Sequence, residues 1–197
     1  NFLLFLGSKV ILYFGMVNPR VERLNEKELI ARAVLRAPSF HPRTGEFDTN
    51  EIVFTLRPGW SNIGGYLPAL PGGKIKQEDF RDPTIDFENP QTVLNRRQMI
   101  EAGMRAAERE ILEELGCVLP VALIYVGRMT NSKWTTWIYA ADLREKPLLQ
   151  VDSDSAGTIW KDETLFKTNK RPKLLPGHLV ATKRALRKLD GQQGLST

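Results

Sequence analysis

The chain has 197 residues, of which 42% are hydrophobic and 26% are charged. These values are ordinary for a globular protein, and the length suits one domain with a core of its own. The net charge of +5 favours an anionic partner but does not by itself indicate nucleic acid. The sequence has a single cysteine, Cys117, so an internal disulfide is excluded. We therefore expect the protein in the cytoplasm or another reducing compartment. The two histidines, His41 and His178, are too far apart in sequence to suggest a zinc motif.

Residues 1–15 are nearly all apolar. Neither of their two apolar runs is long enough to span a bilayer, and a basic region typical of a secretory signal is missing. We therefore expect no membrane association. Because Met16 would make a natural start, we interpret residues 1–15 as an appended segment, with an added strand or a partner-binding arm as the alternative. Residues 16–197 are expected to form a single domain.

The pattern of apolar residues predicts a mixed α/β fold. Strands are expected over 29–36, 51–56, 66–70, 122–129, 134–143 and 158–160. The first two strands are expected to pair antiparallel. Residues 130–133 are expected to be the loop of a hairpin between the strands 122–129 and 134–143. Helices are expected over 90–115, beginning at Asn89 and Pro90, and over 179–189, with Gly116 and Gly191 as their stops. Residues 163–176 are expected to be irregular and basic. This order of elements predicts a mixed sheet with helices on both faces.

Three glutamates near the end of the first helix, Glu110, Glu113 and Glu114, share one side because residues three and four apart lie on the same face. Their repulsion costs roughly 0.2–0.5 kcal/mol per pair, and the negative end of the helix dipole adds to it. A divalent cation would reverse both effects because Mg²⁺ binds carboxylate oxygens. The alternative is a solvated face on which Arg109 pairs with Glu113. Small residues are expected to extend this face and leave room for a ligand: Gly103, Ala106 and Ala107.

The segment from Glu101 to Cys117 resembles the signature box of the Nudix hydrolases: a glutamate, seven residues, and then Arg-Glu-Ile-x-Glu-Glu-x-Gly-Cys. Upstream, Leu-Pro-Gly-Gly-Lys at 70–74 resembles the turn that opens this box. The family places five residues between the box glycine and the first glutamate, whereas 27 residues separate Gly73 from Glu101. We therefore expect an insertion over 75–89, and deletion of residues 77–88 within it should change substrate preference more than stability. The family's glutamate lies at the loop–helix junction, whereas Glu101 would lie inside the predicted helix.

The resemblance implies an α/β/α sandwich that hydrolyses a pyrophosphate bond in a nucleoside diphosphate linked to another moiety. The cofactor that it implies is Mg²⁺ or Mn²⁺. The metal ligands that it implies are Gly73, through its carbonyl, Glu110, Glu113 and Glu114. The catalytic residues that it implies are Glu110, which would deprotonate the water, Glu113 and Arg109, which would hold the carboxylates. The catalytic base varies within the family, and candidates outside the box are Asp152, Asp154 and Glu163.

The sequence leaves the substrate open. Candidate substrate-binding residues are Arg57, Trp60, Tyr66, Arg128 and Trp134, although each is also typical of packing or of a solvated strand. Residues 131–134 resemble, weakly, a segment of ADP-ribose pyrophosphatases, which favours an ADP-ribose-like nucleotide. The basic run 167–173 can meet RNA, but such a run is usually a solvated face. The second functional hypothesis is a catalytically inactive Nudix-fold protein that binds nucleotide or RNA, and a homodimer is left open.

Overall fold

The computed structural model describes residues 28–59, 65–87, 89, 92, 94–150, 156–168 and 172–193. The interpretation of residues 1–15 therefore lies outside the described residues, as do Trp60, Asp152 and Asp154. The strands are β1 (Glu28–Phe40), β2 (Phe47–Leu56), β3 (Pro68–Ala69), β4 (Ile124–Thr130), β5 (Trp134–Asp142) and β6 (Thr158–Asp162). The helices are the 3₁₀ turn η2 (Gln77–Asp79), α1 (Arg96–Leu115), α2 (Thr164–Lys167) and α3 (His178–Gln193).

The strands form one mixed sheet in the order β3-β2-β1-β5-β4, and β6 pairs with β2. The antiparallel pairing of β1 with β2 and of β4 with β5 confirms the two predicted neighbours. The pairing of β1 with β5 is parallel, which joins segments about a hundred residues apart at the centre of the sheet. Within the described ranges, no helix is long and apolar enough to span a membrane.

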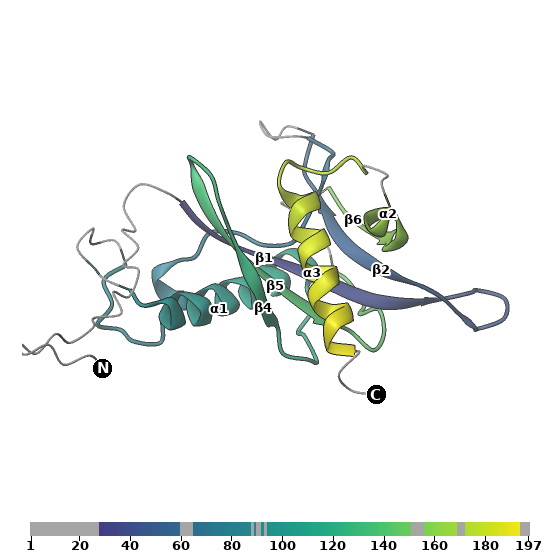
Figure 1. The fold of residues 1–197 in the computed structure, drawn as a ribbon, viewed down its shortest axis with the longest axis horizontal. Helices are drawn as coiled ribbons and strands as arrows, with labels where there is room; N and C mark the ends of the chain where they lie inside the picture. The colour runs from purple at the N-terminus through teal and green to yellow at the C-terminus, as the bar shows by residue number, and fades with distance from the viewer. Residues whose placement is uncertain are drawn as a thin grey trace, which may run out of the picture.

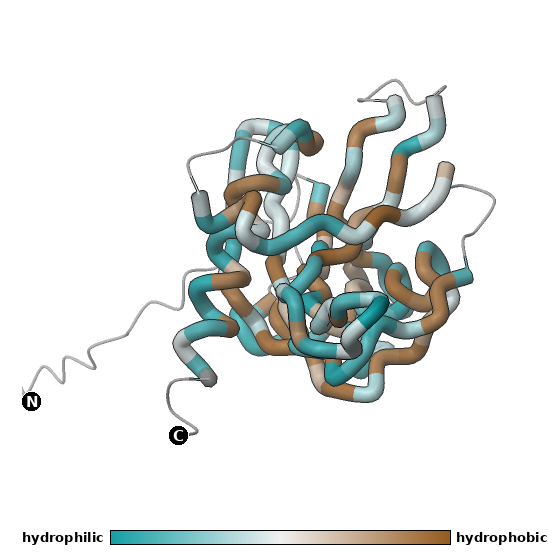
Figure 2. The backbone as a smooth tube through the Cα atoms, turned by 90° about the vertical axis from the view of Figure 1, so that its right-hand side faces the viewer, coloured by the Kyte–Doolittle hydropathy of each residue, from teal (hydrophilic) through white to brown (hydrophobic). Residues whose placement is uncertain are grey.

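Helices cover both faces of the sheet, as the sequence predicted (Figure 1). Because successive strand residues point to opposite faces, Ala33 and Tyr139 lie in the core with α1, whereas Val34 and Ile138 lie in the core with α3. The apolar segments of the chain accordingly alternate with polar ones along the elements (Figure 2). The result is a layered helix–sheet–helix arrangement.

Both long helices differ from their predicted limits at one end. Helix α1 begins at Arg96 rather than Pro90, because Asn95 and Gln98 form a capping box in which each side chain accepts from the other's backbone N–H at 2.9 Å. Gly116 ends α1 as predicted, with φ 62 in the left-handed region. Helix α3 continues through Gly191, since a glycine inside a helix costs only about 1 kcal/mol. The segment expected to be irregular contains the short helix α2.

The small residues of α1 lie against the sheet and leave no room for a ligand there. Gly103, Ala106 and Ala107 are buried, and a Cβ on Gly103 would lie 2.3 Å from the hydroxyl oxygen of Tyr139. That hydroxyl donates to the carbonyl of Ile100 at 2.8 Å. The prediction of an open face at these positions was therefore wrong, because their small size serves the close packing of α1 on the sheet.

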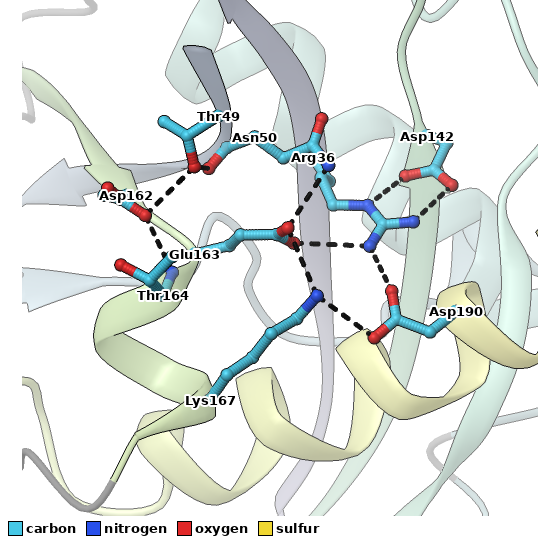
Figure 3. Close-up of polar contacts among 9 residues, drawn as sticks. All are labelled: Arg36, Thr49, Asn50, Asp142, Asp162, Glu163, Thr164, Lys167 and Asp190. Carbon is cyan, nitrogen blue, oxygen red and sulfur yellow. Dashed lines mark hydrogen bonds and ion pairs between the residues drawn. The ribbon is translucent and has the colours of Figure 1, made fainter.

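A network of charged side chains ties the elements together at one end of the sheet (Figure 3). Arg36 is 2% exposed, and its Nε and Nη2 donate to the two carboxylate oxygens of Asp142 at 2.5 and 2.8 Å. Its Nη1 donates to Asp190 at 2.5 Å and to Glu163 at 3.3 Å, and Lys167 pairs with both of these carboxylates at 3.2 Å. Burial lowers the pKa of Arg36, but the bonds to Asp142 and Asp190 outweigh it and raise the pKa above its usual range. The network joins β1, β5, α2 and α3.

Candidate functional site

The turn at Gly72 and Gly73 runs antiparallel beside β1. The N–H of Ala31 donates to the carbonyl of Gly73 at 2.9 Å. Gly72 has φ 141, and a Cβ there would lie 2.1 Å from the carbonyl oxygen of Ala31. A Cβ on Gly73 would lie 2.3 Å from the carboxylate of Glu110. Gly72 is thus required for its backbone conformation, whereas Gly73 leaves the space that the Glu110 carboxylate occupies.

Arg109 holds two of the three clustered carboxylates on α1. Its Nη1 donates to Glu110 at 2.6 Å and to Glu113 at 3.1 Å, while its Nη2 donates to the carbonyl of Lys74 at 2.9 Å. Glu110 is 13% exposed, whereas Glu113 is 49% exposed. Arg109 therefore brings Glu110 and Glu113 together on one side of the helix and offsets part of their repulsion.

Glu114 binds the glycine turn from the other side. The N–H of Gly72 donates to its Oε2 at 3.0 Å. Burial raises the pKa of Glu114 to about 7, and the neighbouring charge of Glu110 adds to this, whereas the Gly72 N–H and Arg32 act in the opposite direction. Arg32 donates to the carbonyls of Leu70 and Gly72 at 3.1 and 2.7 Å, so it supports the turn from within the protein. A cation near Glu114 would favour its charged form.

His178, the first residue of α3, also supports the glycine turn, and the sequence did not predict this role. Its Nδ1 accepts a hydrogen bond from the N–H of Leu70 at 2.8 Å. Burial lowers the pKa of His178 to about 3, and the positive charges of Arg32 and Arg57 contribute in the same direction. A neutral imidazole therefore connects α3 to the residue that precedes the glycine turn.

Asp79 is buried beneath Arg109. Its two carboxylate oxygens accept from Nε and Nη2 of Arg109 at 3.2 and 3.1 Å, and one of them also accepts from the N–H of Lys76 at 2.7 Å. Glu101 lies elsewhere: it pairs with Arg97 at 2.8 Å. Glu101 and Glu110 are nine residues apart, which is about two and a half helical turns and places them on opposite sides of α1. The carboxylate that supports Arg109 is thus that of Asp79.

No protein-family model matches the sequence, and no curated protein matches it. Solved structures do match. A mutT/nudix family protein from Listeria innocua has a TM-score of 0.56 at 19% identity, covering 85% of this chain and 97% of that chain. The NUDIX domain of Shewanella oneidensis NrtR, complexed with ADP ribose, has a TM-score of 0.54 at 18% identity, covering 83% and 88% of the two chains. The chain has a Nudix fold. At sequence identities this low, the structural matches establish the fold alone. The chemistry has to be argued from the residues of this chain.

Within this Nudix fold, Asp79 lies six residues after Gly73, which is the spacing that the family's box gives to its first acidic residue. The sequence therefore contains a signal for Asp79 in its spacing from Gly73. Glu101 was favoured instead because it matches the residue type, glutamate. The carboxylate of Asp79, rather than that of Glu101, completes the contact with Arg109.

The other predicted site residues are dispersed over the Nudix fold. Arg57 is close enough to Glu114 to act on its pKa. Arg128 lies over the ring of Trp137, its guanidinium carbon 5.8 Å from the ring centroid, and Trp134 begins β5. Register through β1 and β5 places Arg128 three strand spacings, about 14 Å, from Gly73. Tyr66 lies outside this cluster, in a hollow described below.

Glu163 does not remain a candidate catalytic base. It is buried, and it accepts hydrogen bonds from Arg36, Asn50 and Lys167 at 3.2–3.3 Å. Both of its carboxylate oxygens are thus already engaged by donors of the protein. Its role is in the network of Figure 3, at the end of β6.

The oxygens around the glycine turn suit a hard divalent cation. In the part of the chain that the structure describes, no three His, Cys, Asp or Glu side chains are already arranged around one metal position. However, Glu110, Glu113 and Glu114 each use only one carboxylate oxygen in the hydrogen bonds described above, so each keeps a second oxygen for a ligand. The carbonyl of Gly73 has a second lone pair as well. Carboxylate and carbonyl oxygens are what Mg²⁺ and Mn²⁺ prefer, so the donor set fits either ion.

Proposed function

We propose that this chain is a metal-dependent pyrophosphohydrolase that cleaves a nucleoside diphosphate linked to another moiety, with an ADP-ribose-like nucleotide as the favoured substrate. The observation that supports it most is the second oxygen on each of Glu110, Glu113 and Glu114 beside the glycine turn, which accepts no hydrogen bond from the described residues. The structural neighbour that carries ADP ribose supports the choice of nucleotide. A pyrophosphate brings clustered negative charge, which these carboxylates would repel without a cation.

In this proposal the residues of α1 and of the turn have separate roles. A bound divalent ion would neutralise the pyrophosphate and lower the pKa of a water. Glu110, Glu113, Glu114 and the carbonyl of Gly73 would be its ligands. Arg109, held by Asp79, would keep Glu110 and Glu113 in place. Glu110 would also accept the proton of the water as the new P–O bond forms and the anhydride P–O bond breaks.

Arg57 is the residue that we assign to a substrate phosphate. Within the described residues its guanidinium makes no hydrogen bond or ion pair, while Arg32 is occupied with the carbonyls of the turn. It is close enough for its charge to lower the pKa values of both Glu114 and His178, which supports this assignment. A guanidinium presents planar pairs of donors that suit phosphate oxygens.

We also propose that the additional residues of the box begin after Asp79 rather than after Lys74. Asp79 supports Arg109, so the chain up to this residue belongs to the site. Phe80 and Ile85 follow it and are buried in the core with α1. The structure therefore argues against the expectation that the segment is dispensable, since its removal would expose part of that core.

The second hypothesis is a Nudix-fold domain that binds a nucleotide or RNA without hydrolysing it. One observation favours it, namely that the described carboxylates are not yet arranged around one metal position. Arg109 would then neutralise Glu110 and Glu113 permanently instead of orienting them for an ion.

The test is hydrolysis of ADP-ribose, NADH, diadenosine polyphosphates, nucleoside triphosphates, nucleotide sugars and capped RNA, with Mg²⁺ and separately with Mn²⁺. Chromatography would follow the two phosphorylated products that cleavage of a pyrophosphate bond leaves. We expect one class to be hydrolysed and the activity to be lost with EDTA. Glu113→Gln and Glu114→Gln should each lower the rate on the order of a hundredfold or more, since each removes a charged ligand. Glu108→Gln, on the exposed side of the same helix, is the matched control. Full activity in both variants, or nucleotide binding without any hydrolysis, would contradict the proposal.

A further inference from the structure

A hollow of about 460 Å³ lies between β3, β6, α2 and the segment that leads into α3. The residues that matter on its walls are Tyr66, Leu67, Leu165, Pro172, Lys161 and Lys173. None of them belongs to the carboxylate cluster. Figure 1 shows β6 and α2 on the side of the molecule away from α1. The hollow is therefore a separate feature, although Leu67 lies only a few residues before the glycine turn.

Tyr66 presents its ring to solvent from an unfavourable backbone conformation. Its side chain is 72% exposed, and its φ of 60 is the only positive value at a non-glycine residue in the described ranges. The N–H of Tyr66 donates to the carbonyl of Arg57 at 2.8 Å, which holds this conformation. A Cβ on Gly59 would lie 2.4 Å from the ring, so the ring rests directly on the glycine backbone. Non-glycine residues in the left-handed region are often found at binding sites, which makes this ring a candidate contact for a ligand.

Two positive charges on the walls of the hollow are not neutralised. Lys161 and Lys173 form no ion pair within the described part of the chain. Lys167, from the neighbouring helix α2, differs because it pairs with Glu163 and Asp190 at 3.2 Å. The hollow therefore combines an aromatic ring, apolar walls and an excess of positive charge.

We propose that this hollow binds a nucleoside phosphate, with the base stacked on Tyr66 and the phosphate paired with Lys161 and Lys173. A nucleobase is flat and apolar on its faces, and stacking on an exposed aromatic ring is a general mode of base binding. A phosphate supplies the negative charge that the two lysines lack. The volume of the hollow is within the range of small-ligand sites. A free nucleotide and the 5′ end of an RNA strand share this chemistry.

The experiment measures binding by isothermal titration calorimetry in EDTA, so that hydrolysis does not contribute. The probes are 5′-AMP, adenosine, inorganic phosphate and a 5′-phosphorylated RNA pentanucleotide. Tyr66→Asn removes the ring with a residue that tolerates positive φ, and it should weaken binding of 5′-AMP about fivefold or more. The double variant Lys161→Gln/Lys173→Gln should weaken it about tenfold or more, since it removes the charge-assisted bonds. Lys188→Gln, an exposed lysine on α3, is the matched control and should leave binding unchanged.

Tighter binding of 5′-AMP than of adenosine or phosphate alone, lost in the two variants, would support the proposal. A pentanucleotide that binds more tightly than 5′-AMP would identify a strand end as the source. The proposal is overturned if neither 5′-AMP nor the pentanucleotide binds at millimolar concentration, or if the variants bind as the parent does. Glu113→Gln should bind 5′-AMP normally in EDTA, so a failure of the proposed hydrolysis and a failure of this site give different results.

Discussion

The buried imidazole of His178 predicts a specific dependence of stability on pH. Its pKa is about 3 in the folded chain, lowered by burial and by the charges of Arg32 and Arg57, against an ordinary value of 6.5. Between these two values the unfolded chain binds a proton at this histidine that the folded chain does not. Stability rises with pH wherever the unfolded state binds more protons. The contribution of His178 is therefore complete above pH 6.5 and is lost as the pH falls toward 3.

The size of the effect follows from the two pKa values. Between them the free energy of unfolding changes by up to about 1.4 kcal/mol per pH unit, so a fall from pH 6.5 to 4.5 should lower it by about 2 kcal/mol through this residue. Other groups titrate in the same window. Glu114, whose pKa is raised by burial to about 7, acts with the opposite sign. The informative quantity is thus the difference between the parent and a variant without the imidazole.

His178→Asn is the suitable variant, since its side-chain oxygen can accept the hydrogen bond of the Leu70 N–H without titrating. Urea unfolding of both proteins between pH 7.5 and 4.5 would give the two free energies of unfolding. The parent should lose about 2 kcal/mol more than the variant between pH 6.5 and 4.5. His41→Asn, at an exposed position, is the control and should follow the parent. Equal losses in the parent and in His178→Asn would refute the assignment of a neutral, buried imidazole.

Two further substitutions test the glycine turn and the charged network. Gly73→Ala should lower the rate of substrate hydrolysis at least tenfold with little loss of fold, because its Cβ would displace the Glu110 carboxylate. Gly191→Ala, with nothing within 4 Å of its Cβ, is the control, and unchanged activity in Gly73→Ala would contradict the geometry. Arg36→Leu should lower the free energy of unfolding by about 3–5 kcal/mol because it leaves carboxylates without their buried partner. Urea unfolding measures this loss, and Arg43→Leu, at an exposed position, is the control. A cost below about 1 kcal/mol in Arg36→Leu would show that the network contributes little.

Most of the secondary structure could be predicted because it depends on residues close together in the chain. The apolar and β-branched residues are enough to locate β2 and β5, since each of these strands buries both faces over part of its length. The end of α1 was predicted because Gly116 adopts a conformation that other residues avoid. Its beginning was missed because a proline at a plausible first position competed with the true cap at Asn95.

The sequence by itself determined the parts of the candidate site that lie on one helix. Helical spacing brings Glu110, Glu113 and Glu114 to one side of α1 and places Arg109 beside them, whatever the rest of the chain does. The resemblance to the Nudix box rests on the same local pattern. The fold that this resemblance implied was confirmed by the solved structures.

Only the tertiary structure decided the contacts between distant segments. Asp79 reaches Arg109 across 30 positions, and Arg36 meets its carboxylates across 106 to 154 positions. Such pairs depend on the order of strands and on the close packing of α1, neither of which leaves a local period in the sequence. The hollow beside Tyr66 likewise combines residues of β3, β6 and α2 that become neighbours only when the sheet forms. Local backbone geometry follows from neighbouring residues, whereas these sites follow from how the whole sheet is assembled.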